Sequence, residues 1–258
     1  MSANLLTLDY DRNSNTDTEQ QSFWRRFSPD IIFFSGLLIL CNLHLITPGL
    51  MPPPLFDSDA FVAGKWWLIL TYSFVHISWY HLLLDAGAFL LLYTGLETKR
   101  ISKRLFYVAG CGVCSFGATF LFEPKIHILG LCGISGIAHG LMAVTALEMI
   151  TDRTYAKQGW FCLFIVGFKS LYEIITGKML FDFLLFGMCG TPLTASHIGG
   201  VIGGIISFSL MAWLKSVSCC SQAQTPIHRE SVSRLAGRLR IIKISWSSFH
   251  HDYQRFRQ

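Results

Sequence analysis

Long apolar stretches alternate with short polar ones along most of this 258-residue chain. Most of the apolar stretches approach or exceed the roughly 20 residues that a helix needs to cross the hydrocarbon core of a bilayer. The second is long enough to hold a re-entrant or interfacial segment before its spanning part. The pattern predicts six membrane-spanning helices, within residues 31–50, 66–96, 101–122, 132–150, 160–176 and 194–214.

The composition agrees with this pattern. Hydrophobic residues make up 52% of the chain and charged residues 14%, and the mean hydropathy is +0.44. An ordinary soluble domain carries about 25% charged residues. These values exclude a soluble globular domain, a disordered chain, a collagen and a small disulfide scaffold. We therefore predict an all-α polytopic membrane protein.

The distribution of Lys and Arg predicts the orientation of the helices. Of 21 basic residues, 17 lie on one side of the predicted membrane and 3 on the other. Basic residues gather on the cytoplasmic side, so both termini are expected in the cytoplasm. The predicted organisation is a polar cytoplasmic N-terminal segment (1–30), a six-helix domain (31–214) and a basic cytoplasmic tail (215–258).

Two segments are apolar or amphipathic without being long enough to span. Residues 179–189 (MLFDFLLFGMC) either form a flap over a cavity or extend the preceding helix. In the tail, apolar residues from Val232 to Trp246 recur every three or four positions among basic ones. This stripe predicts an amphipathic helix on anionic lipid or, equally, a solvated basic tail. No nucleic-acid-binding module is visible.

Polar residues inside membrane helices are costly and therefore point to function. The fourth predicted helix opens with the sequence GISG, which contains Ser135, and the sixth opens with ASHIGGVIGG, which contains His197. Both helices start on the outer side in the predicted orientation. Ser135 and His197 should therefore lie at similar depth, within the first turn of each helix.

This arrangement suits nucleophilic catalysis. A serine hydroxyl becomes a useful nucleophile when a base lies within hydrogen-bond distance. Two small-residue faces, Gly136 with Gly140 and Gly200 with Gly204, would let the two helices approach closely. The helix start at Ser135 offers free N–H groups for a developing oxyanion. The sequence does not indicate a third catalytic residue beside Ser135 and His197.

Other polar groups have more ordinary interpretations. Cys111 and Cys114 form a CxxC within an apolar stretch, which favours a structural role over a redox or metal role. Lys169 and Glu173 are four residues apart and can form a structural ion pair on one helix face. The intramembrane histidines could also bind a metal, but we predict no metal site. The four histidines are His76, His81, His139 and His197.

Taken together, these motifs resemble the rhomboid family of intramembrane serine proteases. The GxSG motif spans residues 133–136, and His197 precedes two Gly-Gly pairs in the last helix. The second apolar stretch carries His76, His81 and Asp85 at the spacing of the family's His, His and Asn, followed by Gly95-Leu-Glu97. The resemblance covers residues 31–214 and implies a six-helix rhomboid-like bundle.

The resemblance implies cleavage of transmembrane or juxtamembrane segments by a Ser–His dyad, with no cofactor. Ser135 would be the nucleophile and His197 the general base and then acid. His81 would help to bind the oxyanion together with the Ser135 N–H group, and Gly133 and Asp85 would support the site. Partners would be transmembrane protein substrates and membrane lipid, in a bacterial inner membrane.

The chain departs from the family pattern at several positions. Asp85 replaces an Asn that donates to the oxyanion, so it would either be protonated or orient His81 as an acceptor. His139 replaces an aromatic residue that often stacks beside the catalytic His. The compact core, the sequence GISGIAHG and the lack of a Trp-Arg signature look most like the rhombosortase subgroup. That subgroup is linked to removal of C-terminal Gly-Gly-type membrane anchors from exported proteins.

Two alternatives from other classes remain open. A catalytically silent rhomboid relative that binds membrane clients is favoured only by Asp85. A small transporter would use the histidines together with Lys169 and Glu173 as an ion path.

Overall fold

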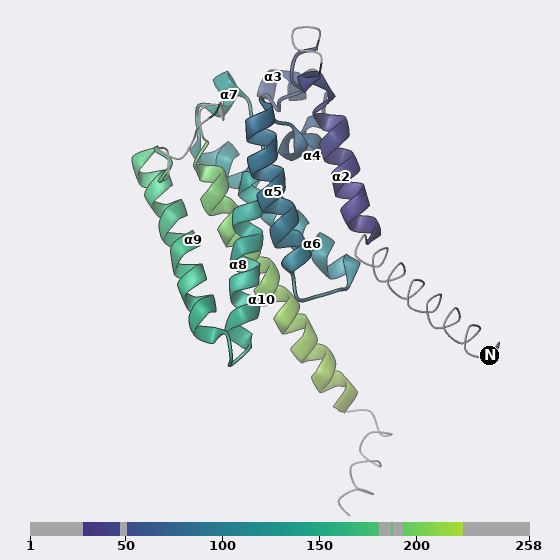
Figure 1. Cartoon of the computed structure of the whole chain (residues 1–258), viewed down its shortest axis with the longest axis vertical. Coiled ribbons are helices and arrows are strands. Elements are labelled where there is room, and N and C mark those ends of the chain that lie inside the picture. The colour runs from purple at the N-terminus through teal and green to yellow at the C-terminus, as the bar shows by residue number, and fades with distance from the viewer. Residues whose placement is uncertain (1–27, 47–50, 181–186, 188–192, 224–258) are drawn as a thin grey trace, which may run out of the picture. The chain divides into compact units, whose positions relative to one another are not determined.

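The computed structural model describes residues 28–46, 51–180, 187 and 193–223, and this part of the chain is helical with one isolated β-bridge, between Phe56 and Leu131 (Figure 1). The longer helices are α2 (Pro29–Cys41), α5 (Trp79–Gly95), α6 (Ile101–Phe122), α8 (Ser135–Thr151), α9 (Ala156–Thr176) and α10 (Ala195–Ala223). The short ones are η1 (Leu43–Leu45), α3 (Ser58–Val62), α4 (Leu68–Thr71), η2 (Tyr72–Phe74) and α7 (Ile126–Leu129).

The chain forms two units, residues 1–208 and 209–258. The described part of the second unit is the C-terminal part of α10. The packing and the site discussed below belong to the first unit.

The prediction of an all-helical membrane protein is confirmed for the described residues, and each of the six predicted stretches contains a helix. Three helices, α6, α9 and α10, are long and apolar enough to cross a membrane. A fourth crossing results if α4 and η2 are joined with α5. The prediction of six crossings, and of two cytoplasmic termini, stays a prediction.

The second apolar stretch is divided into a short leading segment and a longer helix, as its length predicted. Residues 68–74 form the short lead-in α4–η2, and α5 follows after a bend of 94°. Ser78 caps α5, because its side chain accepts a hydrogen bond from the backbone N–H of His81 at 3.1 Å. A new helix therefore starts at Trp79.

The first apolar stretch was predicted to continue to residue 50, but α2 ends at Cys41. The cause is the buried amide of Asn42. Its Nδ2 donates to the carbonyl oxygens of Leu38 (2.7 Å) and Phe74 (2.6 Å), and its Oδ1 accepts from the N–H of His76 (2.8 Å). These bonds turn the chain out of the helix and tie it to the segment before α5.

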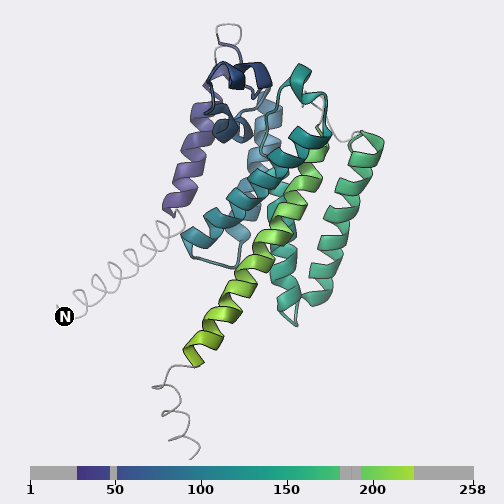
Figure 2. The same cartoon turned by 180° about the vertical axis from the view of Figure 1, so that it is seen from behind.

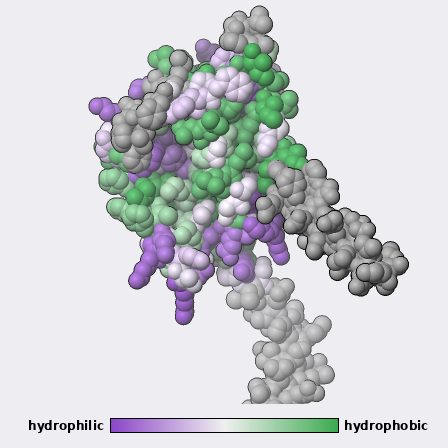
Figure 3. Space-filling view, in the orientation of Figure 1, coloured by the Kyte–Doolittle hydropathy of each residue, from purple (hydrophilic) through white to green (hydrophobic). Residues whose placement is uncertain are grey.

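Helix α8 is the centre of the first unit. It packs against α5, α6 and α9 (Figures 1 and 2), and residues such as Leu141, Ala143 and Val144 are fully buried. The outer surface is apolar instead of polar. On α9, Phe164 and Ile175 are 66% and 74% exposed, and apolar atoms cover much of the face in Figure 3 while hydrophilic side chains gather along its lower edge. Such a surface suits contact with lipid.

A buried ion pair joins three helices away from the predicted site. Arg104 on α6 lies 3.0 Å from the carboxylate of Asp30 on α2 and donates to the backbone carbonyl of Tyr93 on α5 at 2.5 Å. The Tyr93 hydroxyl also donates to Asp30. Because Arg104 and Asp30 are both buried, neither can regain full hydration if its partner is lost.

Replacing Arg104 by Met should therefore lower the free energy of unfolding by about 3–5 kcal/mol, the usual cost of breaking a buried pair. Thermal unfolding in detergent would measure the effect. The control Arg100→Met removes an exposed charge one turn earlier and should change stability by less than about 1 kcal/mol. Equal stability of the two variants would show that the pair contributes nothing.

Several predictions concern segments outside the described residues. They are most of the polar N-terminal segment 1–30, the amphipathic stripe from 232 to 246, and most of the candidate flap 179–189. They stay predictions.

Candidate active site

Ser135 and His197 lie together at the starts of two helices. Ser135 is the first residue of α8, and His197 lies two residues after the start of α10. The Ser135 Oγ and His197 Nε2 atoms are 3.1 Å apart, which is hydrogen-bond distance. His197 is buried, with 4% of its surface exposed. The structure therefore brings the two predicted residues together.

Glycines bring α8 and α10 this close, as the sequence predicted. A Cβ atom on Gly200 would collide with the carbonyl oxygen of Gly136, and one on Gly204 would collide with that of Gly140. The two contacts follow the same order along both helices, so the helices run parallel. Their starts, and hence Ser135 and His197, are held side by side.

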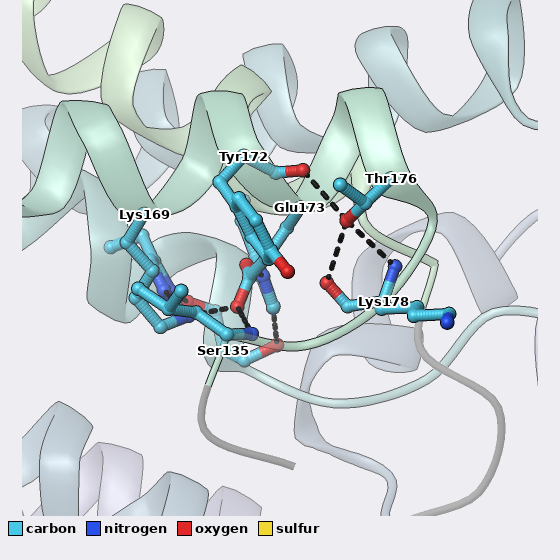
Figure 4. A network of polar contacts seen from close by, with 9 residues as sticks. Ser135, Lys169, Tyr172, Glu173, Thr176 and Lys178 are labelled. Carbon is cyan, nitrogen blue, oxygen red and sulfur yellow. Dashed lines mark hydrogen bonds and ion pairs between the residues drawn. The ribbon is translucent and has the colours of Figure 1, made fainter.

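A buried carboxylate contacts the second ring nitrogen of His197. Glu173 on α9 has no exposed surface, and its Oε2 lies 2.7 Å from His197 Nδ1. Its Oε1 accepts from the ammonium of Lys169 at 2.6 Å and from the backbone N–H of Leu180 at 3.2 Å. Figure 4 shows Lys169 and Glu173 on α9 converging with Ser135. The sequence indicated no third residue beside the pair, and the structure places Glu173 there.

His139 lies against the Ser135–His197 pair as a second imidazole. Its ring stacks on that of His197 with centroids 4.0 Å apart and planes 12° apart. Its Nδ1 lies 2.8 Å from the carbonyl oxygen of Ser135, and its Nε2 lies 2.9 Å from the ammonium of Lys169. His139 thus takes the stacking position that the resemblance assigned to an aromatic residue.

His81 and Asp85 lie on one face of α5, next to the loop that leads into α8. The His81 Nε2 and Asp85 Oδ2 atoms are 3.2 Å apart, and His76 Nε2 is 3.7 Å from the same oxygen. A Cβ on Gly133 would lie 3.1 Å from both His81 Nε2 and Asp85 Oδ2. Gly133 also has a φ of +94°, which favours glycine. A side chain at residue 133 would crowd His81 and Asp85, so glycine favours the close approach of this loop.

Two clusters of the described residues have the composition of a metal site. They are His76 with His81 and Asp85, and His139 with Glu173 and His197, each with donor atoms within 4.8 Å of one another. In the second cluster every donor already faces a hydrogen-bond partner, and the Lys169 ammonium would repel a cation. That cluster therefore fits a hydrogen-bond network better than a metal.

The sequence did not reveal the contact between Glu173 and His197, because local spacing joins Glu173 only to Lys169, four residues away. Its approach to His197 depends on how α9 packs against the α8–α10 pair. One signal was present in the sequence: a carboxylate within a membrane helix is costly unless it is paired or functional.

Comparison with known proteins identifies a family for most of the described region. The family model described as Rhomboid domain matches residues 63–214, which include every candidate site residue. A Bacillus subtilis (strain 168) protein named "Putative rhomboid protease YdcA" is 26% identical over 132 residues, 49% of this chain and 64% of that protein. The alignment thus spans less than two thirds of that relative's length.

Relatives that match over a longer range come from mycobacteria. Rv1337 of Mycobacterium tuberculosis (strain ATCC 25618 / H37Rv) and Mb1372 of Mycobacterium bovis, both named as uncharacterized proteins, are each 22% identical over 215 residues. These alignments cover 78% of this chain and 82% of each relative. No solved structure matches the chain. Since the family model covers more than half of the chain, the chain belongs to the Rhomboid domain family.

Proposed function

We propose that this chain is an intramembrane serine endopeptidase whose nucleophile is Ser135 and whose general base is His197. The observation that carries the proposal is the 3.1 Å contact between Ser135 Oγ and His197 Nε2 at the starts of two parallel helices. Membership of the rhomboid family, which suggests intramembrane proteolysis, supports the same conclusion.

The reaction is acyl transfer. His197 Nε2 takes the hydroxyl proton as Ser135 Oγ bonds to the scissile carbonyl carbon, and the same nitrogen then protonates the leaving amine as the C–N bond breaks. Water attacks the acyl-enzyme, gives a proton to His197, and Ser135 regains its proton when the ester bond breaks. No step requires a cofactor.

The oxyanion would be stabilised at the start of α8. The first N–H groups of a helix have no partner within it, and Ile134 at the N-cap makes no side-chain cap bond. The Ser135 N–H group is therefore a donor for the developing charge, and His81 is a second donor beside the loop at Gly133. We assign Asp85 a supporting role beside His81, because its Oδ2 lies 3.2 Å from His81 Nε2.

The assignment of Asp85 predicts a graded series of rates. His81→Ala should lower the cleavage rate about 10²–10³-fold, as loss of one oxyanion donor does. Asp85→Leu should lower it similarly, whereas Asp85→Asn keeps an acceptor for His81 and should stay within about tenfold of wild type. Initial rates on one substrate would measure the series. A rate that rises more than tenfold in Asp85→Asn would instead mean that the carboxylate opposes the oxyanion.

The proposed substrates are membrane-anchored proteins, with C-terminal anchors that follow a Gly-Gly motif as the first class to test. The rhombosortase-like features of the sequence support this class. The experiment places the purified protein in liposomes with a single-span substrate that carries Gly-Gly before its span and a basic cluster after it. Mass spectrometry should find cleavage at or beside the span. A matched substrate with Val-Val should be cut at least tenfold more slowly, and equal cutting would reject this specificity.

The proposed location is a bacterial inner membrane with both termini in the cytoplasm. The apolar outer surface supports a multi-pass membrane protein, and the unequal distribution of Lys and Arg supports the orientation. The site would then open toward the outer half of the bilayer.

A second candidate function is client binding without catalysis, as in a silent member of the family. Asp85 favours it, because an ionised carboxylate near the oxyanion would oppose the reaction. Client binding that survives Ser135→Ala, with no cleavage by wild type, would support it. The transporter alternative relied on Lys169 and Glu173 as part of an ion path. Their contacts with His139 and His197 instead favour a role in this site.

A further inference from the structure

We infer that Glu173 is a positioning residue, so that the site is a Ser–His–Glu triad of Ser135, His197 and Glu173. Lys169 holds the carboxylate of Glu173 in the charged form. This inference rests on the proposed function. It concerns the Glu173 carboxylate, which contacts the ring nitrogen of His197 that does not face Ser135, and the Lys169 ammonium beside that carboxylate.

The carboxylate of Glu173 is held at both oxygens. Oε2 faces His197 Nδ1 at 2.7 Å, while Oε1 accepts from Lys169 at 2.6 Å and from the backbone N–H of Leu180 at 3.2 Å. All three partners can donate. A group that receives donors on both oxygens and is fully buried has a fixed position.

These contacts define where the protons lie. An ionised carboxylate only accepts, so His197 Nδ1 must carry the proton that it donates to Glu173. In the neutral imidazole the other nitrogen, Nε2, then has a free lone pair, and this atom is the one that faces Ser135 Oγ. Glu173 thereby selects the tautomer of His197 that can act as a base.

The stacked histidine is fixed by the same cation. Lys169 has no acceptor, so it donates to His139 Nε2, and His139 Nδ1 donates to the Ser135 carbonyl oxygen. His139 is therefore neutral and cannot take the place of His197 in proton transfer. Lys169 and Glu173 cancel each other's charge, which reduces the cost of placing them in the membrane.

The triad acts most strongly after proton transfer begins. When His197 accepts the Ser135 proton it becomes an imidazolium, and the Glu173 carboxylate then lies 2.7 Å from its positive charge. The carboxylate stays ionised throughout and stabilises this intermediate state. The effect should appear in the chemical step and leave reagent binding unchanged.

The test measures covalent labelling of the purified protein by a fluorophosphonate, separating the maximal labelling rate from the half-saturating reagent concentration. Glu173→Gln keeps the shape but not the charge. If the amide oxygen of the new side chain accepts from His197 Nδ1, its NH₂ group faces the Lys169 ammonium, which can only donate. If the NH₂ group donates to Nδ1 instead, His197 carries its proton on Nε2 and cannot act as a base toward Ser135. The maximal rate should fall at least about 100-fold, with half-saturation unchanged within about threefold.

Two further variants separate positioning from folding. Glu173→Gln combined with Lys169→Met removes both charges and should regain thermal stability close to wild type while its labelling rate stays low. Glu148→Gln changes another buried glutamate, which accepts from the backbone N–H of Glu97 at the other end of α8, and should keep the wild-type rate. Wild-type labelling in Glu173→Gln, or recovery of the rate in the double variant, would overturn the inference.

Ser135→Ala distinguishes this failure from failure of the proposed function. If Ser135→Ala abolishes labelling while Glu173→Gln labels like wild type, only the triad is wrong. If Ser135→Ala is still labelled as fast as wild type, the nucleophile is another residue, and the proposed function and the triad both fail.

Discussion

Ser135→Ala and His197→Ala should each reduce cleavage of a single-span substrate to background, a loss of about 10⁴-fold or more. Alanine at 135 removes the nucleophilic oxygen. Alanine at 197 removes the base that lies 3.1 Å from this oxygen. The two groups act as one unit, so the double variant should be no slower than either single variant. Initial rates in liposomes would measure all three.

The loss must come from chemistry and not from unfolding. Ser135 is at the first position of α8, and its replacement creates no large cavity. Ser135→Ala should therefore keep its thermal unfolding temperature within a few degrees of wild type. Cleavage by Ser135→Ala at more than about 1% of the wild-type rate would contradict its assignment as nucleophile.

Gly200→Ala should destabilise the protein by about 3 kcal/mol, the upper end of the usual cost of overpacking, and abolish activity with it. The added methyl would collide with the backbone carbonyl oxygen of Gly136, and a backbone atom cannot move aside as a side chain can. Helices α8 and α10 would separate three residues beyond His197, which would also break the contact with Ser135. Thermal unfolding and labelling of the same samples would record both effects.

Gly167→Ala is the matched control. It lies within α9, and a Cβ there would meet no atom within 4 Å. Because alanine favours a helix more than glycine does, this variant should be as stable as wild type or up to about 1 kcal/mol more stable. A similar loss in both variants would mean that the close approach of α8 and α10 is not the cause.

The parts of the site that lie close in sequence could be predicted. Ser135 within GISG and His197 before its glycines each stand at a helix start, and the small residues that let the helices meet recur every four positions. The long apolar stretches also located the longer helices, because length and polarity decide what can lie in a bilayer. These features are local, so one sequence carries them.

The parts that depend on tertiary packing could not be predicted. Glu173 pairs with Lys169 along its own helix, and nothing in the spacing indicates that α9 turns this carboxylate toward His197. Likewise, α2 ends early because the amide of Asn42 bonds to the carbonyl of Phe74, 32 residues away. Such contacts join residues that are distant in the chain, and hydropathy alone does not reveal them.

Fluorophosphonate labelling of the wild-type protein beside Ser135→Ala and His197→Ala tests the central claim most directly. Digestion and mass spectrometry of the labelled protein would locate the adduct. We predict one adduct, on Ser135 of the wild type, and none in either variant. An unlabelled wild type under conditions that label an active rhomboid protease, or an adduct that forms without His197, would contradict an activated Ser135–His197 pair.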